Sequence, residues 1–158
     1  TLSLHDALPI CPLKVMVIDG PNLNLLGRRE PAIYGATSLG EIRARLMEVA
    51  AELGVEVEFF QSNGEGELID AIHRAGEAAD GIVINPGAYG HYSIAMRDAL
   101  AAVGVPAVEV HISNVYARED FRSTSIIAPV CFGGVWGFGA DVYEWGLRAL
   151  IKKLRENG

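Results

Sequence analysis

The chain has 158 residues, of which 50% are hydrophobic and 21% charged, a composition typical of one globular domain that folds without disulfides or metals. Its net charge of −7 argues against binding to nucleic acid, which requires a basic surface. Cys11 and Cys131 lack the spacing of a disulfide scaffold or a metal site, and no apolar run reaches the roughly 18 residues of a membrane span, so we expect a cytoplasmic protein.

The first ten residues stand apart from the rest of the chain. They contain no basic segment of the kind that begins a secretory signal. As a string they resemble a translated sequencing adapter joined to a gene. We therefore expect residues 1–10 to be a non-native extension and residues 11–158 to form a single domain.

From residue 11 onward, strand and helix patterns alternate along the chain. The remaining sequence predicts, in order, a buried strand over 15–19, a helix over 39–53, a half-exposed strand over 55–60, a helix over about 68–80, a short apolar strand over 82–84, a helix over 91–103, a strand over 105–112, a strand within 126–138 and a helix over about 143–155. Five strand–helix repeats predict an α/β protein with a parallel sheet covered on both faces. At this length the flavodoxin-like, doubly wound strand order 2-1-3-4-5 is favoured.

The connection after the first strand, over about 20–37, is much longer than a usual strand-to-helix loop. It contains Arg28, Arg29 and Tyr34, which suit a small anionic substrate, between two glycines that can act as hinges. The alternative is a solvated surface loop with ordinary charges. The loop alone leaves both interpretations open.

Polar residues also follow the third and fourth predicted strands. In a doubly wound sheet, ligands bind beyond the carboxyl ends of the strands, near the switch between strands one and three. The predicted order makes strands one, three and four neighbours, so their polar residues meet at one edge. These residues are Asp19, Asn22, Asn24, Arg28, Arg29 and Tyr34 after the first strand, Asn85 and His91 after the third, and Glu109, His111, Ser113, Asn114, Arg118 and Arg122 at and after the fourth.

An acid and a base can be recognised among these groups. Glu109 and His111 are two residues apart in a strand, so both side chains point to the same face. A carboxylate beside a histidine can orient its ring and stabilise the protonated form, as a general acid requires. The alternative is a histidine satisfied in the core. Tyr34 lies near two arginines that would stabilise its phenolate and make it a usable base.

Other chemistries lack the residues that they require. No glycine-rich phosphate loop or nucleophile elbow follows a strand, and the histidines lack the spacing of metal ligands, so no metal or cofactor is expected. The lysines, Lys14, Lys152 and Lys153, do not end a strand, which argues against a Schiff base. The other tyrosines of this region are expected to pack, and they are Tyr89, Tyr92 and Tyr143.

The motifs together resemble those of the type II 3-dehydroquinate dehydratases, enzymes of the shikimate pathway. The resemblance spans about residues 13–154 and rests on four separated motifs in the same order. These are residues 18–27, residues 28–35, the Asn-Pro-Gly-Ala-Tyr of 85–89, and residues 109–114 with Arg118 and Arg122. Around His91 this chain departs from the pattern of the family. Threonines are expected there, and this chain has Gly90 and Tyr92 instead.

The resemblance implies a lyase that eliminates water from 3-dehydroquinate in the anti sense, through an enolate and without a cofactor. The loop over 20–37 would then be a lid that closes over the substrate. The residues that match catalytic positions are Tyr34 as the base for the C2 proton, Arg29 beside it, His111 as the acid for the C1 hydroxyl, Asn22 at the enolate oxygen, and Glu109 and Arg118 at activating positions.

The resemblance also implies a substrate-binding set and an assembly. The matching residues are Asn85, Ile112 and Ser113 at the carboxylate, Gly87 beside them, and His91, Asp98 and Arg122 at the ring hydroxyls. His91 and Asp98 fall on one predicted helix about 10 Å apart, too far for one small substrate to contact both. The family resolves this as a homododecamer, a tetramer of trimers, in which Asp98 reaches a neighbouring subunit's site.

A different class of function remains an alternative at this point. A non-catalytic flavodoxin-like module that binds a small ligand has the same fold. Such a module requires neither an acid–base pair nor a lid with arginine and tyrosine, and this chain has both.

Overall fold

The computed structural model describes residues 11–157, so the expectation that residues 1–10 are a non-native extension lies outside the described residues. Five parallel strands form one sheet in the order β2-β1-β3-β4-β5, which confirms the predicted flavodoxin-like arrangement. The strands are β1 Lys14–Asp19, β2 Glu56–Gln61, β3 Gly81–Asn85, β4 Ala107–His111 and β5 Gly133–Trp136. The apolar β3 is buried throughout at the centre, whereas β2 lies at an edge.

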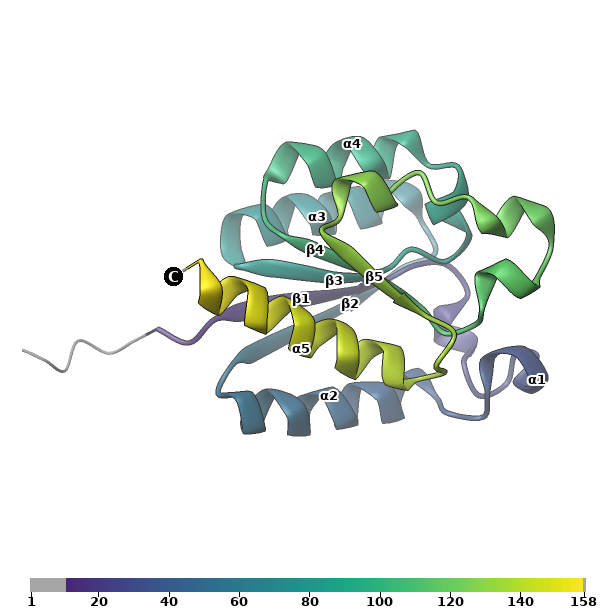
Figure 1. Ribbon diagram of the computed structural model, residues 1–158, viewed down its shortest axis with the longest axis horizontal. Helices are drawn as coiled ribbons and strands as arrows, with labels where there is room; N and C mark the ends of the chain where they lie inside the picture. The colour runs from purple at the N-terminus through teal and green to yellow at the C-terminus, as the bar shows by residue number, and fades with distance from the viewer. Residues whose placement is uncertain (1–10, 158) are drawn as a thin grey trace, which may run out of the picture.

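Helices cover both faces of the sheet (Figure 1). On one face lie α2 Leu39–Leu53 and α5 Asp141–Glu156, and on the other lie α3 Glu65–Ala78 and α4 Ile94–Val103. Each face has its own cluster of buried apolar side chains, because successive residues of a strand point to opposite sides. The two clusters pack the helices against the sheet, and the carboxyl ends of its strands lie together at one edge.

The helix after the long loop begins where the sequence predicts. The backbone N–H of Glu41 donates to the hydroxyl of Ser38 at 3.1 Å, and the backbone N–H of Ser38 donates to the Glu41 carboxylate at 3.3 Å. This reciprocal capping box satisfies two of the donors that a helix N-terminus leaves free. Gly54 ends the helix in the left-handed conformation, with φ 68°.

The predicted helix over 91–103 is wrong at its N-terminus. Ser93 accepts a hydrogen bond from the backbone N–H of Met96 at 3.1 Å, and this cap starts α4 at Ile94. His91 instead ends a separate 3-10 helix, η2 Gly87–His91. His91 and Asp98 therefore do not share one helix, and the axial spacing calculated between them from the sequence does not apply.

The loop after β1 is partly ordered into helical turns. It contains the 3-10 helix η1 Leu23–Leu25 and the one-turn helix α1 Pro31–Tyr34, and α1 ends at Gly35, whose φ is 79°. At its start, a side chain at Gly20 would collide with the backbone carbonyl of Pro86, so only glycine lets this loop pass so close to the end of β3.

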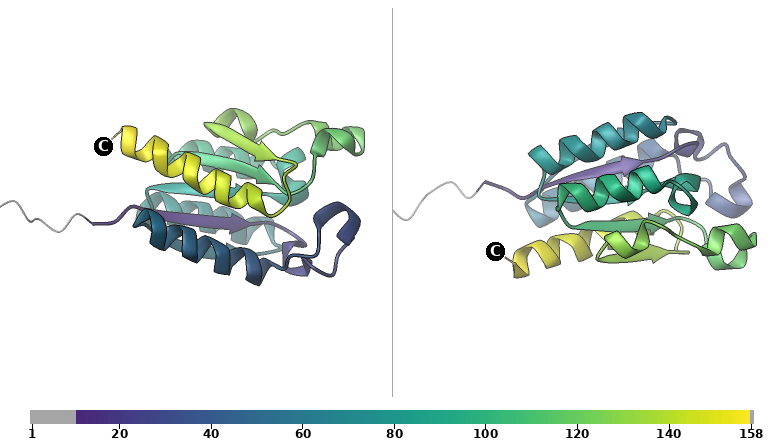
Figure 2. Two further views of the ribbon diagram at one scale, coloured as in Figure 1. Left: turned by 60° about the horizontal axis from the view of Figure 1, so that its bottom comes forward. Right: turned by 90° about the horizontal axis from the view of Figure 1, so that it is seen from above.

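The segment between β4 and β5 lies opposite this loop. It contains three 3-10 helices, η3 Val115–Ala117, η4 Asp120–Ser123 and η5 Ala128–Val130. Figures 1 and 2 show α1 and the turns after β4 projecting together beyond the carboxyl ends of the strands. No helix within residues 11–157 is long and apolar enough to cross a membrane.

Candidate active site

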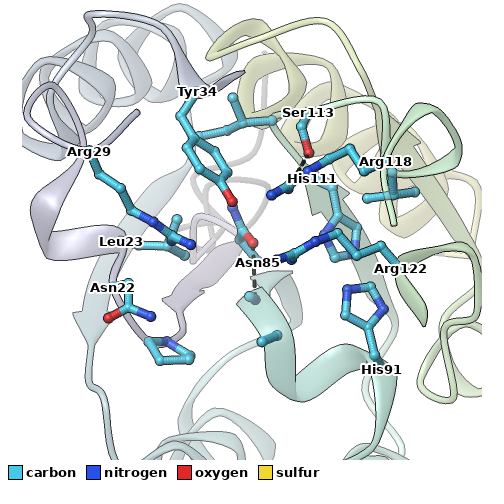
Figure 3. Close-up of a pocket in the computed structure, with 15 residues that line it drawn as sticks. Asn22, Leu23, Arg29, Tyr34, Asn85, His91, His111, Ser113, Arg118 and Arg122 are labelled. Carbon is cyan, nitrogen blue, oxygen red and sulfur yellow. Dashed lines mark hydrogen bonds between the residues drawn. The ribbon is translucent and has the colours of Figure 1, made fainter. Parts of the chain in front are cut away.

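A cavity lies at the carboxyl edge of the sheet, between the loop after β1 and the segment after β4 (Figure 3). Of the residues matched to catalytic and substrate-binding positions, all but Glu109 and Asp98 line this cavity. Four other polar residues expected at this edge do not line it, and they are Asp19, Asn24, Arg28 and Asn114. The predicted residues that line it are Asn22, Arg29, Tyr34, Asn85, Gly87, His91, His111, Ile112, Ser113, Arg118 and Arg122. Segments far apart in the sequence thus supply one site.

Tyr34 lies between two guanidinium groups. The guanidinium carbon of Arg29 is 4.5 Å from the centre of the tyrosine ring, and that of Arg118 is 5.1 Å away on the other segment. Arg28, which the sequence analysis pairs with Tyr34, is exposed and does not line the cavity. Arg118 supplies the second cation instead, and its Nη1 donates to the Ser113 hydroxyl at 3.1 Å. Both cations would stabilise negative charge that develops on the phenolic oxygen.

Glu109 lies behind His111 and holds its ring. The His111 Nε2 is 2.8 Å from the Glu109 carboxylate, so Nε2 carries a hydrogen and Nδ1 is the nitrogen left for another partner. The hydroxyl of Ser125 donates to Glu109 at 2.7 Å and accepts from the backbone N–H of Ala128 at 3.1 Å. The sequence analysis misses Ser125, because it lies 16 residues after Glu109 in a different segment and no sequence pattern connects the two residues.

His91 has a different environment from His111, although the two rings stack with centres 6.1 Å apart. The His91 Nδ1 is 2.8 Å from the carbonyl of Thr124, which can only accept, so Nδ1 carries the hydrogen. Burial lowers the pKa of His91, and the nearby His111 and Arg122 act in the same direction. The hydrogen bond to Thr124 and the charge of Glu109 oppose this shift. The lowered pKa favours the neutral ring, whose Nε2 can accept a hydrogen bond from a hydroxyl.

A buried polar chain lies behind the cavity. Asn85 lines the cavity at the end of β3, and its Nδ2 donates to the hydroxyl of Tyr143 at 2.9 Å. That hydroxyl donates in turn to the Asp19 carboxylate at 2.5 Å. Burial raises the pKa of Asp19 to about 6, and the hydrogen bond from Tyr143 opposes the shift only in part. The sequence analysis expects Tyr143 only to pack and therefore misses this contact.

The raised pKa of Asp19 makes stability depend on pH. Because the native pKa exceeds the value of 3.8 in the unfolded chain, stability is greatest below that value and falls as Asp19 ionises, up to about pH 6. In Asp19→Asn this dependence is absent. We expect the free energy of unfolding of wild type, relative to Asp19→Asn, to fall by up to about 3 kcal/mol between pH 4 and 7.

Urea unfolding of both proteins at several pH values and one protein concentration measures this difference. A difference between the two proteins that stays constant from pH 4 to 7 would contradict the assigned environment of Asp19.

Asp98 lies on α4 and does not line this cavity. Its side chain is 67% exposed and forms an ion pair with Arg97 at 3.4 Å.

The lysines lie outside the cavity: Lys14 begins β1, and Lys152 and Lys153 are on α5. Among the residues that the structure describes, no three histidine, cysteine or acidic side chains are grouped as a metal site.

Comparison with known proteins gives the same family that the sequence motifs resemble. A sequence model of the family described as dehydroquinase class II matches residues 13–151. The 3-dehydroquinate dehydratase of Carboxydothermus hydrogenoformans is 61% identical over 143 residues, which are 90% of this chain and 93% of that protein. The corresponding protein of Pelotomaculum thermopropionicum is 58% identical over 137 residues, which are 87% of this chain and 95% of that protein.

Solved structures extend the similarity to three dimensions. The crystal structure of type II dehydroquinase from Butyrivibrio crossotus matches with a TM-score of 0.87 and 48% identity, covering 89% of this chain and 98% of the other. That of the type II dehydroquinase from Propionibacterium acnes matches with a TM-score of 0.84 and 42% identity, covering 92% of this chain and 98% of the other.

Proposed function

The chain belongs to the class II dehydroquinase family, and on that premise we propose that its cavity removes water from 3-dehydroquinate by an anti elimination through an enolate. The overall activity is that of a type II 3-dehydroquinate dehydratase, an enzyme of the shikimate pathway. Membership of an enzyme family sets aside the alternative of a non-catalytic binding module. The proposal concerns how the residues of the cavity divide the work.

Tyr34 is the base of the proposed reaction. Its phenolate takes the proton from C2, and the electrons of the broken C–H bond pass into the C3 carbonyl to form the enolate. Arg29 and Arg118, on either side of the ring, stabilise the phenolate before this step. Asn22 lies in the same cavity and helps to hold the enolate oxygen through a water molecule.

His111 is the acid of the proposed reaction. When the enolate collapses to the C1=C2 double bond, the C1–O bond breaks and the departing oxygen takes a proton from the His111 ring to leave as water. Glu109 holds the ring at 2.8 Å and stabilises the imidazolium before the proton leaves, and Ser125 holds Glu109. The proton available for transfer is the one on Nδ1, because Nε2 is turned toward Glu109.

The remaining residues of the cavity bind the substrate. Asn85 and the backbone N–H groups of Ile112 and Ser113 bind the carboxylate, while His91 and Arg122 contact the ring hydroxyls. The backbone N–H of Gly87 donates to the Asn85 side-chain oxygen at 3.2 Å, so Gly87 contributes by holding Asn85. None of these steps requires a metal ion or an organic cofactor.

The observation that carries the proposal is the pairing across one cavity of Tyr34, flanked by two cations, with His111, held by a carboxylate. Purified protein with 3-dehydroquinate should produce the ultraviolet absorbance of a conjugated enone. Borohydride added with the substrate should leave the activity intact and the protein mass unchanged. A borohydride-trapped adduct on a lysine would replace the enolate mechanism by an imine mechanism.

We further propose that the enzyme is a homododecamer, a tetramer of trimers, in which Asp98 completes the site of a neighbouring subunit. The exposure of Asp98 and its absence from its own subunit's cavity support this arrangement. Tyr34→Phe and Asp98→Asn should each be poor enzymes alone. Refolded together in equal amounts, they should regain roughly a quarter of wild-type sites, because half the sites hold Tyr34 and half of those receive Asp98.

Activity of the mixture is measured alongside native mass spectrometry, which reports whether the subunits have exchanged. Mixed oligomers without recovered activity would place both residues in one subunit's site and contradict the shared site.

A further inference from the structure

A buried polar chain that the proposed reaction steps do not use links three elements below the cavity. Asp19 ends β1, Asn85 ends β3 and Tyr143 lies in the first turn of α5, and their exposed fractions are 0%, 3% and 1%. The Tyr143 hydroxyl is 2.5 Å from the Asp19 carboxylate and 2.9 Å from the Asn85 Nδ2. Only Asn85 of the three lines the cavity (Figure 3).

The donors and acceptors of this chain allow one direction. An ionised carboxylate only accepts, so the single hydroxyl proton of Tyr143 is directed to Asp19. The phenolic oxygen then has only lone pairs left for Asn85, which must present its Nδ2–H. On its other side the Asn85 Oδ1 accepts from the backbone N–H of Gly87 at 3.2 Å. Turning the amide over would set lone pair against lone pair at Tyr143 and hydrogen against hydrogen at Gly87.

We propose that Tyr143 is a positioning residue for substrate binding, which turns the Asn85 amide so that its second Nδ2–H faces the substrate carboxylate. The inference rests on the proposed function, in which Asn85 contacts that carboxylate. The opposite orientation would present the amide oxygen to an anion. Tyr143 therefore acts on binding from behind the cavity without touching the substrate.

The inference has a kinetic signature. The substrate carboxylate keeps its charge throughout the elimination, so a hydrogen bond to it is equally strong in the ground state and in the transition state. Loss of such a bond raises KM and leaves kcat nearly unchanged. A hydroxyl that served only to stabilise the fold would instead lower the melting temperature without this separation of KM from kcat.

The test is a double-mutant cycle with Tyr143→Phe, Asn85→Ala and both together. We expect Asn85→Ala to raise KM about tenfold or more, and Tyr143→Phe to raise it about three- to tenfold with kcat within about threefold of wild type. In the Asn85→Ala background, Tyr143→Phe should raise KM no further, because the group that it orients is gone. Equal effects of Tyr143→Phe in both backgrounds would overturn the inference.

Tyr143→Phe leaves the Asp19 carboxylate buried without its donor, and the variant can fail to fold for that reason. The variant Asp19→Leu/Tyr143→Phe removes both partners and replaces them by apolar groups of similar size, which a core tolerates. It should fold with a cooperative thermal transition and still show the raised KM. A normal KM in this folded variant would overturn the inference. The proposed function is tested separately, because it fails only if the wild-type protein does not turn over 3-dehydroquinate.

Discussion

Tyr34→Phe is expected to lower kcat by about a hundredfold or more, the usual loss when a general base is removed. The hydroxyl is the only group lost, and the ring keeps its place between Arg29 and Arg118, so KM should change far less. The measurement is steady-state turnover of 3-dehydroquinate, with thermal melting to establish that the variant is folded.

Tyr92→Phe is the matched control for this variant. It removes the same hydroxyl from a tyrosine that is 61% exposed and does not line the cavity, and it should turn over substrate like wild type. If Tyr34→Phe also retains near-normal kcat, Tyr34 has no part in proton abstraction.

His111→Asn is expected to lower kcat by about a hundredfold to ten-thousandfold, because the departing hydroxyl loses its proton donor and must leave as hydroxide. Glu109 and Ser125 remain in place, although the carboxylate loses its partner at 2.8 Å. The control His73→Asn changes an exposed histidine on α3 and should be fully active.

Turnover of both variants is compared with their melting temperatures. A folded His111→Asn enzyme with kcat within about threefold of wild type would assign the acid to another group.

The sheet could be predicted from the sequence because several strands are short apolar runs bounded by turn residues, and its order could be predicted from the alternation of strands and helices at this chain length. The wholly apolar 82–84 indicates a buried central strand, and the alternation of acidic and apolar residues over 55–59 indicates a half-exposed strand at an edge. Both lie where these patterns place them. The gathering of polar residues at one edge then follows from the topology alone.

Contacts made by side chains across long stretches of sequence could not be predicted in the same way. Tyr34 is paired in the sequence with Arg28, its near neighbour, yet the second cation is Arg118 from the segment after β4. Ser125 beside Glu109 and Tyr143 beside Asn85 leave no local pattern either. Such contacts depend on how the segments pack, because periodicity and spacing report only the face on which a residue lies.

The first residue of α4 could not be predicted correctly from the sequence. The predicted helix begins at residue 91, directly after Gly90, but Ser93 caps α4 and the residues before it form the separate 3-10 helix η2. This places His91 beside the carbonyl of Thr124, which directs its free nitrogen for binding. The identity of the site residue is unchanged, and the element that carries it is different.

The central claim is that Tyr34 removes the C2 proton and His111 protonates the C1 hydroxyl from opposite faces of the substrate. It is tested most directly with two samples of 3-dehydroquinate that each carry one deuterium at C2. In one sample the deuterium lies on the face opposite the C1 hydroxyl, and in the other it lies on the same face as that hydroxyl. The product's mass reports which hydrogen is lost. Anti elimination predicts that the label opposite the hydroxyl is lost and the other is retained. The reverse result would contradict the assignment of the two residues.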